Sequence, residues 1–222
     1  MTAVNLIVQE RGVYIIADGA LYDHDGTVRA ICSKALIADG ERLALIPGGR
    51  ANPVEVRDGL IRSGANTQAE IMQALPRIAA DIRAGNRRAH PEWDAAGDND
   101  LQLYVALWSD ERDQPEAWML STCALPHWGP YVPGTWIQVD SMLNLVEPIA
   151  DVLGRDADVS RAAEFDPSTD GLAVLEAQRR YVWPDGRHYV GGRVELVSVT
   201  REGVSKKVLR EWPDKIGERI AA

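Results

Sequence analysis

One residue near the start of this 222-residue chain could supply both a nucleophile and a base. Thr2 becomes the first residue once the initiator Met1 is removed, and an N-terminal threonine carries a hydroxyl beside a free α-amine. The hydroxyl can attack a carbonyl carbon while the amine takes its proton. Because the ordinary pKa of an α-amine is about 7.7–8.0, an appreciable fraction is unprotonated at neutral pH. Thr2 is therefore a candidate nucleophile for acyl transfer.

Three further features lie in register with Thr2, each within or close to the end of an expected strand. Asp18 follows Thr2 by sixteen residues, Lys34 by thirty-two and Gly48 by forty-six, and Gly49 extends the last into a glycine pair. In this pattern the first fifty residues resemble N-terminal nucleophile (Ntn) hydrolases of the proteasome β-subunit type. The resemblance is closest to the bacterial proteasome-like proteases.

The resemblance implies a role for each residue. Thr2 would be the nucleophile, and Lys34 would lower the pKa of its hydroxyl electrostatically. Asp18 would hold Lys34 charged and oriented. The backbone N–H of Gly48 would donate to the developing oxyanion, which needs a backbone that a substrate can approach closely. The expected product of the first step is a Thr acyl-enzyme, formed without a metal or cofactor and then hydrolysed by water.

The resemblance also implies a fold and an assembly. The fold would be the four-layer αββα Ntn-hydrolase sandwich, with two mainly antiparallel sheets between helix layers. The protein would be an autoprocessing threonine-type peptidase or amidohydrolase that assembles as a homo-oligomer and acts on peptide or amide substrates. Neither the substrate side chains, the ring size nor a regulatory ATPase can be identified from these residues.

The C-terminal half departs from the family pattern. The family carries a later aspartate, and a serine before a Gly-Gly turn, which together support the amine of the nucleophile. Asp185 matches that aspartate if a short insertion is allowed, and Gly191 and Gly192 match the glycine pair. Val190 stands where the serine would be, and a valine side chain cannot hydrogen-bond.

This departure leaves alternatives open. Ser121 and Ser141 are both candidates for the second supporting serine of the family. A catalytically inactive protein of the same fold, acting as a structural or assembly component, is the main rival to a peptidase. An amidase for a small non-peptide substrate is a third hypothesis.

The expected elements that position these residues alternate between strands and helices. Short runs rich in Val, Ile and Leu predict strands at 4–9, 12–18, 30–37, 42–46, 101–109, 116–122, 193–200 and 204–212. Helical spacing and capping residues predict helices at 53–63, 67–84, 141–153 and 168–181, the second kinked at Pro76, with a loop at 86–100. The order predicts one α+β domain over residues 1–222, with short links that favour antiparallel hairpins.

Composition limits the class of protein. The formal net charge of −9 argues against general nucleic-acid binding, which depends on clustered Lys and Arg. No window approaches the ~20 apolar residues of a membrane span, and the N-terminus lacks a signal-peptide pattern. Cys32 and Cys123 are isolated, and the four histidines lack metal-ligand spacing. We therefore expect a cytoplasmic protein with neither a membrane nor a nucleic-acid partner.

Overall fold

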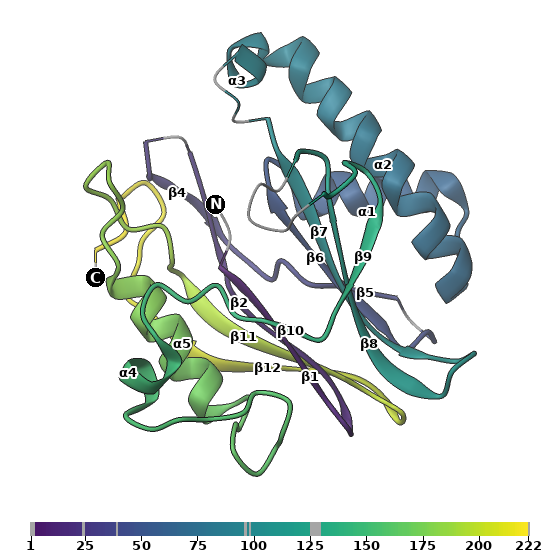
Figure 1. Cartoon of the computed structure of the whole chain (residues 1–222). Helices are drawn as coiled ribbons and strands as arrows, with labels where there is room; N and C mark the ends of the chain where they lie inside the picture. Colours follow the sequence, from purple (N-terminus) through teal and green to yellow (C-terminus); the bar gives the residue numbers. More distant parts are fainter. Residues whose placement is uncertain are drawn as a thin grey trace.

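The computed structural model describes residues 3–23, 25–38, 40–95, 97, 99–124 and 130–221. Within these ranges the chain forms a mixed α/β fold with three antiparallel sheets and five helices (Figure 1). Met1 and Thr2 lie outside the described residues, so the predicted nucleophile itself is not placed.

The first five-stranded sheet joins the two ends of the chain. Its strands, in spatial order, are β10 (Ser141–Met142), β1 (Val4–Gln9), β2 (Gly12–Asp18), β11 (Arg193–Thr200) and β12 (Gly203–Glu211). At the centre of the sheet, Ile15 of β2 lies opposite Leu6 on one side and Val197 on the other. Because β2 is covered on both edges, Asp18 at its end is positioned by two neighbouring strands.

The second five-stranded sheet is a run of neighbouring hairpins. Its strands, in order, are β5 (Leu36–Ala38), β6 (Leu43–Gly49), β7 (Leu101–Ser109), β8 (Gln114–Ser121) and β9 (Trp136–Val139). A separate two-stranded sheet pairs β3 (Ala20–Tyr22) with β4 (Val28–Ile31). This small sheet directly follows Asp18 and carries the chain towards Lys34.

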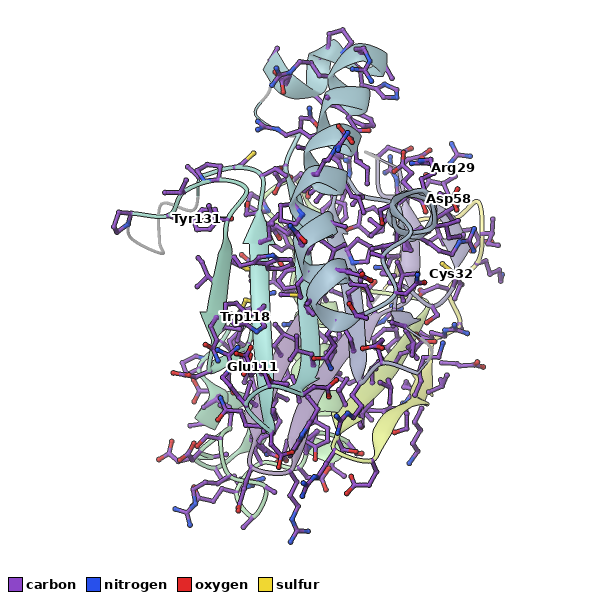
Figure 2. All side chains as sticks on the ribbon, turned by 90° about the vertical axis from the view of Figure 1, so that its right-hand side faces the viewer. Arg29, Cys32, Asp58, Glu111, Trp118 and Tyr131 are labelled. Atoms are coloured by element: carbon purple, nitrogen blue, oxygen red, sulfur yellow. The ribbon has the colours of Figure 1, made fainter. Side chains whose placement is uncertain are left out.

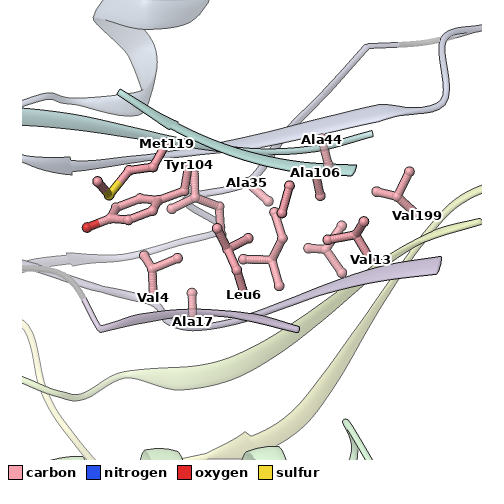
Figure 3. Close-up of a cluster of buried hydrophobic side chains, with 14 of the residues drawn as sticks. Val4, Leu6, Val13, Ala17, Ala35, Ala44, Tyr104, Ala106, Met119 and Val199 are labelled. Carbon is pink, nitrogen blue, oxygen red and sulfur yellow. The ribbon is translucent and has the colours of Figure 1, made fainter. Parts of the chain in front are cut away.

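The two large sheets pack face to face through one buried apolar cluster. Figure 3 shows Val4 and Ala17 of the first sheet facing Tyr104 and Met119 of the second, with Ala35 between the two layers. All five are buried, and burial of apolar surface is the main favourable term in folding. The cluster between the two sheets includes Ala17 and Ala35, so it ends next to Asp18 and Lys34.

The helices pack on the outer faces of the two sheets. On the second sheet lie α1 (Pro53–Ser63) and α2 (Gln68–Ala89), followed by the short α3 (Pro91–Ala95), and on the first lie α4 (Ile149–Leu153) and α5 (Thr169–Arg180) (Figure 1). Figure 2 shows α2 running along the second sheet, with Trp118 of β8 labelled. The Trp118 side chain packs against the apolar cluster to which α2 contributes. Both α1 and α2 begin with a capping box, at Asn52 and Thr67, which satisfies the first backbone N–H groups.

Several predicted boundaries were wrong for identifiable reasons. The helix expected at 141–153 is instead the short strand β10, a loop and the one-turn α4. Pro148 precedes α4, and a proline disfavours helical backbone in the residue before it. The strand expected at 30–37 is two strands, β4 and β5, in different sheets, separated by residues 32–35.

The second helix is longer than expected. It continues through Pro76 and past residue 85 to Ala89, and α3 occupies part of the expected loop. The side-chain amide of Asn86 donates to the backbone oxygen of Arg50, 3.1 Å away, and so attaches the added turn to the residue after β6. None of the described helices combines the length and the apolar character needed to cross a membrane.

Candidate functional site

Asp18 and Lys34 form a buried ion pair. The ammonium Nζ of Lys34 lies 2.7 Å from Oδ1 of Asp18, and the side chains are 2% and 0% exposed. A charge taken out of water costs several kcal/mol unless it is paired and hydrogen-bonded. The contact that the resemblance implies between these residues is present, and each charge compensates the other.

Three backbone N–H groups complete the surroundings of the Asp18 carboxylate. Ala3 donates to Oδ1 at 3.1 Å, while Ala20 and Gly191 each donate to Oδ2 at 3.3 Å. With the Lys34 ammonium, both carboxylate oxygens accept two hydrogen bonds. Since Ala3 directly follows Thr2 in the chain, the ion pair lies one peptide unit from the predicted nucleophile.

The segment that carries Lys34 is fastened on both sides. Cys32 donates its backbone N–H to the oxygen of Gly19 at 2.9 Å, and the Ser33 hydroxyl donates to Oε2 of Glu195 at 2.6 Å. Ala35, next along, is buried between the sheets. Lys34 is thus held from β11 and from the residue after Asp18, without regular strand pairing of its own.

Strand β1, which leads back to Thr2, is anchored by a buried amide network. The side chains of Asn5 and Gln178 exchange two hydrogen bonds, of 3.2 and 3.1 Å. Asn144 donates its backbone N–H to Oδ1 of Asn5 at 2.9 Å and its side-chain N–H to the oxygen of Val4 at 2.8 Å. These contacts fix the strand immediately after the predicted nucleophile against α5.

Gly48 and Gly49 are the last two residues of β6, which extends beyond the expected strand end at residue 46. They lie opposite Gln102 and Leu101 of β7. Gly49 has φ +68°, and a Cβ there would lie 2.5 Å from the backbone oxygen of Asp100. Only glycine fits such a position without strain. The proposed oxyanion role of Gly48 stays a prediction.

The Gly191–Gly192 turn, which matches the family's glycine pair in sequence, lies against Asp18. Beyond its bond to Asp18, Gly191 accepts backbone N–H groups of Gly19 and Ala20 at 3.2 and 3.0 Å. Gly192 has φ +77°, and a Cβ there would approach the backbone nitrogen of Ala20 to 3.1 Å. Both glycines therefore allow close backbone contact beside Asp18.

The other predicted supporting residues make different contacts. Asp185 accepts from the Tyr189 hydroxyl and from the Arg187 backbone N–H, and the first of these bonds lowers the pKa of its carboxyl. The Ser121 hydroxyl donates to the oxygen of Cys123 at 3.0 Å. The Ser141 hydroxyl accepts the backbone N–H of Val8 at 3.0 Å. Among the described residues, none of the three hydrogen-bonds to Ala3, Asp18 or Lys34.

Val190 lies just before the glycine pair with its side chain buried at 6% exposure. It packs in the cluster that joins α5 to the first sheet. The position that the resemblance matches to the family's serine is thus occupied by an apolar side chain that contributes to the core.

Ala3 borders an open cleft of about 2530 Å³, which is also lined by residues of α1 and α2. Its wall includes Tyr22, which packs on Tyr189 with ring centroids 5.1 Å apart, and Arg50, whose guanidinium lies 4.4 Å from the centre of the Trp93 ring. The residue that follows the predicted nucleophile in the chain is therefore in contact with an open space.

Two tyrosines at this end of the molecule have raised pKa values. Burial is the main cause for Tyr22, and the negative charge of Asp18 adds to it. Burial also raises the pKa of Tyr104, whose hydroxyl donates to Oε1 of Gln102 at 2.5 Å. Both phenols stay protonated well above neutral pH and can act there as neutral hydrogen-bond donors.

Across the part of the chain that the structure describes, no three His, Cys, Asp or Glu side chains gather as a metal site. Cys32 and Cys123 are both free thiols.

Sequence reasoning missed two groups near the site, the Asn5–Gln178 amide pair and an ion pair between Arg179 and Asp214. Their partners are 173 and 35 positions apart, so no local pattern links them. The available signal was an arginine at a core-facing position of an expected helix, because a buried Arg requires a partner.

No protein-family model matches the chain, and no curated protein matches it either.

Proposed function

We propose that the chain is a threonine-type Ntn hydrolase that cleaves peptide or amide bonds through an acyl-enzyme on Thr2. The observation that supports this most strongly is the buried Asp18–Lys34 pair, with Ala3 bonded to the same carboxylate. A lysine and an aspartate rarely become fully buried without a partner, and here both are placed next to the residue that follows Thr2.

The proposed reaction uses Thr2, Lys34 and a backbone donor. After removal of whatever precedes Thr2, which is Met1 in this sequence, its α-amine takes the hydroxyl proton as the oxygen attacks the substrate carbonyl. The Lys34 ammonium stabilises the developing alkoxide, and the Gly48 N–H stabilises the oxyanion. The carbonyl–nitrogen bond breaks, the amine leaves with the proton, and water then hydrolyses the ester on Thr2.

The arrangement of layers supports the same proposal. Two five-stranded antiparallel sheets share one core, and each has helices on its outer face. We interpret this as the four-layer αββα sandwich of the Ntn hydrolases. Assembly into a homo-oligomer is part of the proposal and rests on the resemblance.

A panel of fluorogenic peptide amides and small amides tests the activity. Wild type should hydrolyse at least one member of the panel, and Thr2→Ala should abolish that hydrolysis while leaving the circular dichroism spectrum unchanged. Thr135→Ala is the matched control, because the Thr135 hydroxyl bonds only locally, to the oxygen of Val132 at 2.7 Å in an exposed loop. Equal rates for wild type and Thr2→Ala would overturn the proposal.

A second function, an inactive assembly component of the same fold, is favoured by one observation. Val190 fills the position of the supporting serine with a buried apolar side chain. Retention of Met1 on the protein purified from cells would support this alternative, whereas an acyl group on Thr2 would refute it.

A further inference from the structure

We propose that Arg179 and Asp214 are positioning residues, which hold the Gly191–Gly192 turn against Asp18 and so fix the Asp18–Lys34 pair. The catalytic meaning of this inference rests on the proposed function. The hydrogen bonds that support the inference are independent of the proposed function.

Arg179 and Asp214 form a two-pronged ion pair beside the turn. The Nη1 and Nη2 atoms of Arg179 each lie 2.8 Å from one carboxylate oxygen of Asp214. The side chains are 7% and 4% exposed. A planar guanidinium that meets a carboxylate through two parallel bonds fixes orientation as well as distance. The pair therefore joins the end of α5 rigidly to the segment after β12.

Both residues of the pair also bind the backbone of the turn. Nη1 of Arg179 donates to the oxygen of Val190 at 2.9 Å, and Oδ2 of Asp214 accepts the N–H of Gly192 at 2.7 Å. The residue between these two contacts is Gly191, whose own N–H donates to Asp18. The ion pair thus holds the turn on both sides of Gly191, whose N–H donates to the Asp18 carboxylate.

The space around Gly191 leaves no room for adjustment. A Cβ at this position would lie 2.7 Å from Oδ2 of Asp214 and 2.9 Å from Cδ1 of Ile220. Arg179 is held from a third direction by the oxygen of Ala221 and by the Trp212 ring, whose centre lies 4.6 Å from the guanidinium carbon. Displacement of Asp214 would therefore shift the turn, and with it one of the four donors to Asp18.

This arrangement gives the C-terminal segment a part in the site. In the family pattern, side chains near the Gly-Gly turn support the nucleophile directly, whereas Val190 cannot do so here. The ion pair binds the backbone of the same turn instead. That turn positions Asp18, and Asp18 positions Lys34.

The test compares Asp214→Asn with Asp170→Asn. Asp170 is a matched control because it also accepts an arginine and a backbone N–H, from Arg155 at 2.6 Å and Asp166 at 2.8 Å, but at the start of α5. Amide hydrogen exchange is followed by NMR in the full chain at a temperature where both variants are folded. In Asp214→Asn we expect Gly191 and Gly192 to exchange at least about tenfold faster than in wild type, with the middle of β11 unchanged. Asp170→Asn should leave both glycines at wild-type rates.

A second readout is acylation of Thr2 by a β-lactone probe, followed by intact mass. Asp214→Asn should lower the limiting acylation rate at saturating probe at least about tenfold, with the probe concentration for half-maximal rate unchanged. Asp214→Glu, which keeps the charge, should recover part of that loss. Loss of folded protein alone would not lower the limiting acylation rate per folded chain while leaving the half-maximal probe concentration unchanged.

The outcomes are distinguishable. Wild-type exchange at Gly191 in Asp214→Asn, or equal acceleration throughout β1, β2 and β11, would overturn the inference. So would an unchanged limiting acylation rate. Wild-type protein that is never acylated would overturn the proposed function alone, and the exchange rates would still decide whether the ion pair holds the turn.

Discussion

Gly191 donates its backbone N–H to the Asp18 carboxylate although the two residues lie 173 positions apart in the chain. The C-terminal half, in which the family pattern is weakest, therefore contributes directly to the pair that the N-terminal half predicts. The contact requires a backbone that passes close to Gly19 and Ala20, which explains the glycine pair at this turn.

Gly192→Ala should destabilise the protein more than Gly186→Ala. Both glycines have φ +77°, so alanine meets the left-handed penalty of about 1–2 kcal/mol at either position. Only at 192 would the new Cβ also press on neighbours, at 3.0–3.2 Å, whereas nothing lies within 4 Å at 186. Urea unfolding should show an additional loss of about 1–3 kcal/mol at 192. Equal losses would mean that the turn is not tightly packed against Ala20.

Lys34→Ala should lower both activity and stability. We expect the rate of hydrolysis to fall by orders of magnitude, because the proposed mechanism loses the cation that stabilises the Thr2 alkoxide. Leaving the buried Asp18 carboxylate without its cation should cost about 3–5 kcal/mol of unfolding free energy. Peptide-amide hydrolysis and urea titration measure the two effects.

The control for Lys34→Ala is an exposed ion pair away from the cleft, Lys215 with Glu218, whose side chains are 72% and 62% exposed. Glu218→Gln should change neither rate nor stability measurably, since exposed pairs contribute little. The double variant Asp18→Asn/Lys34→Met should lose less stability than the two single variants summed. Strict additivity would contradict a direct pairing in solution.

Gln178→Ala should loosen the strand that leads to Thr2. The change removes the acceptor of the buried Asn5 side-chain N–H, which costs about 1–3 kcal/mol, whereas Oδ1 of Asn5 keeps the N–H of Asn144. Gln73→Ala is the matched control, because Gln73 is an exposed residue of the helix α2. Faster amide exchange in β1 with Gln178→Ala, and not with Gln73→Ala, is the expected result. Unchanged exchange in β1 would show that the network does not anchor it.

Tyr104 should make the protein less stable at alkaline pH. Its pKa in the folded protein is raised above the ordinary value of 10.0 by burial, so the folded state keeps the phenol proton longer than the unfolded state. The free energy of unfolding is unaffected by this group below pH 10.0 and falls as the pH rises further. Tyr104→Phe should therefore show a shallower decline between pH 10 and about 11.5, measured as the urea midpoint. The difference in urea midpoint between wild type and Tyr104→Phe at pH 7 measures the other interactions of the hydroxyl. Equal declines of the two midpoints between pH 10 and about 11.5 would contradict a raised pKa of Tyr104.

Local patterns sufficed for much of the fold. The bounds of β1, β2, α1, β7 and β11 agree with the sequence expectation, because each is an apolar or amphipathic run that ends at strong turn or capping residues. The Asp18–Lys34 contact was expected from the family resemblance of the first fifty residues, and the structure contains it.

Other elements depend on distant partners. The strand β10 exists because Ser141 and Met142 pair with β1, more than 130 positions earlier, and residues 141–153 alone look helical. The Arg179–Asp214 pair follows from how α5 crosses the first sheet, which no window of sequence contains. Helix α2 passes Gly85 because Asn86 reaches the residue after β6.

The most direct test of the account is the intact mass of the purified protein before and after treatment with a Thr-directed β-lactone. We predict that Met1 is absent and that each chain gains one probe, which peptide mapping locates on Thr2 and which Thr2→Ala does not acquire. A chain that keeps Met1 and gains no probe would contradict the proposal of a threonine nucleophile.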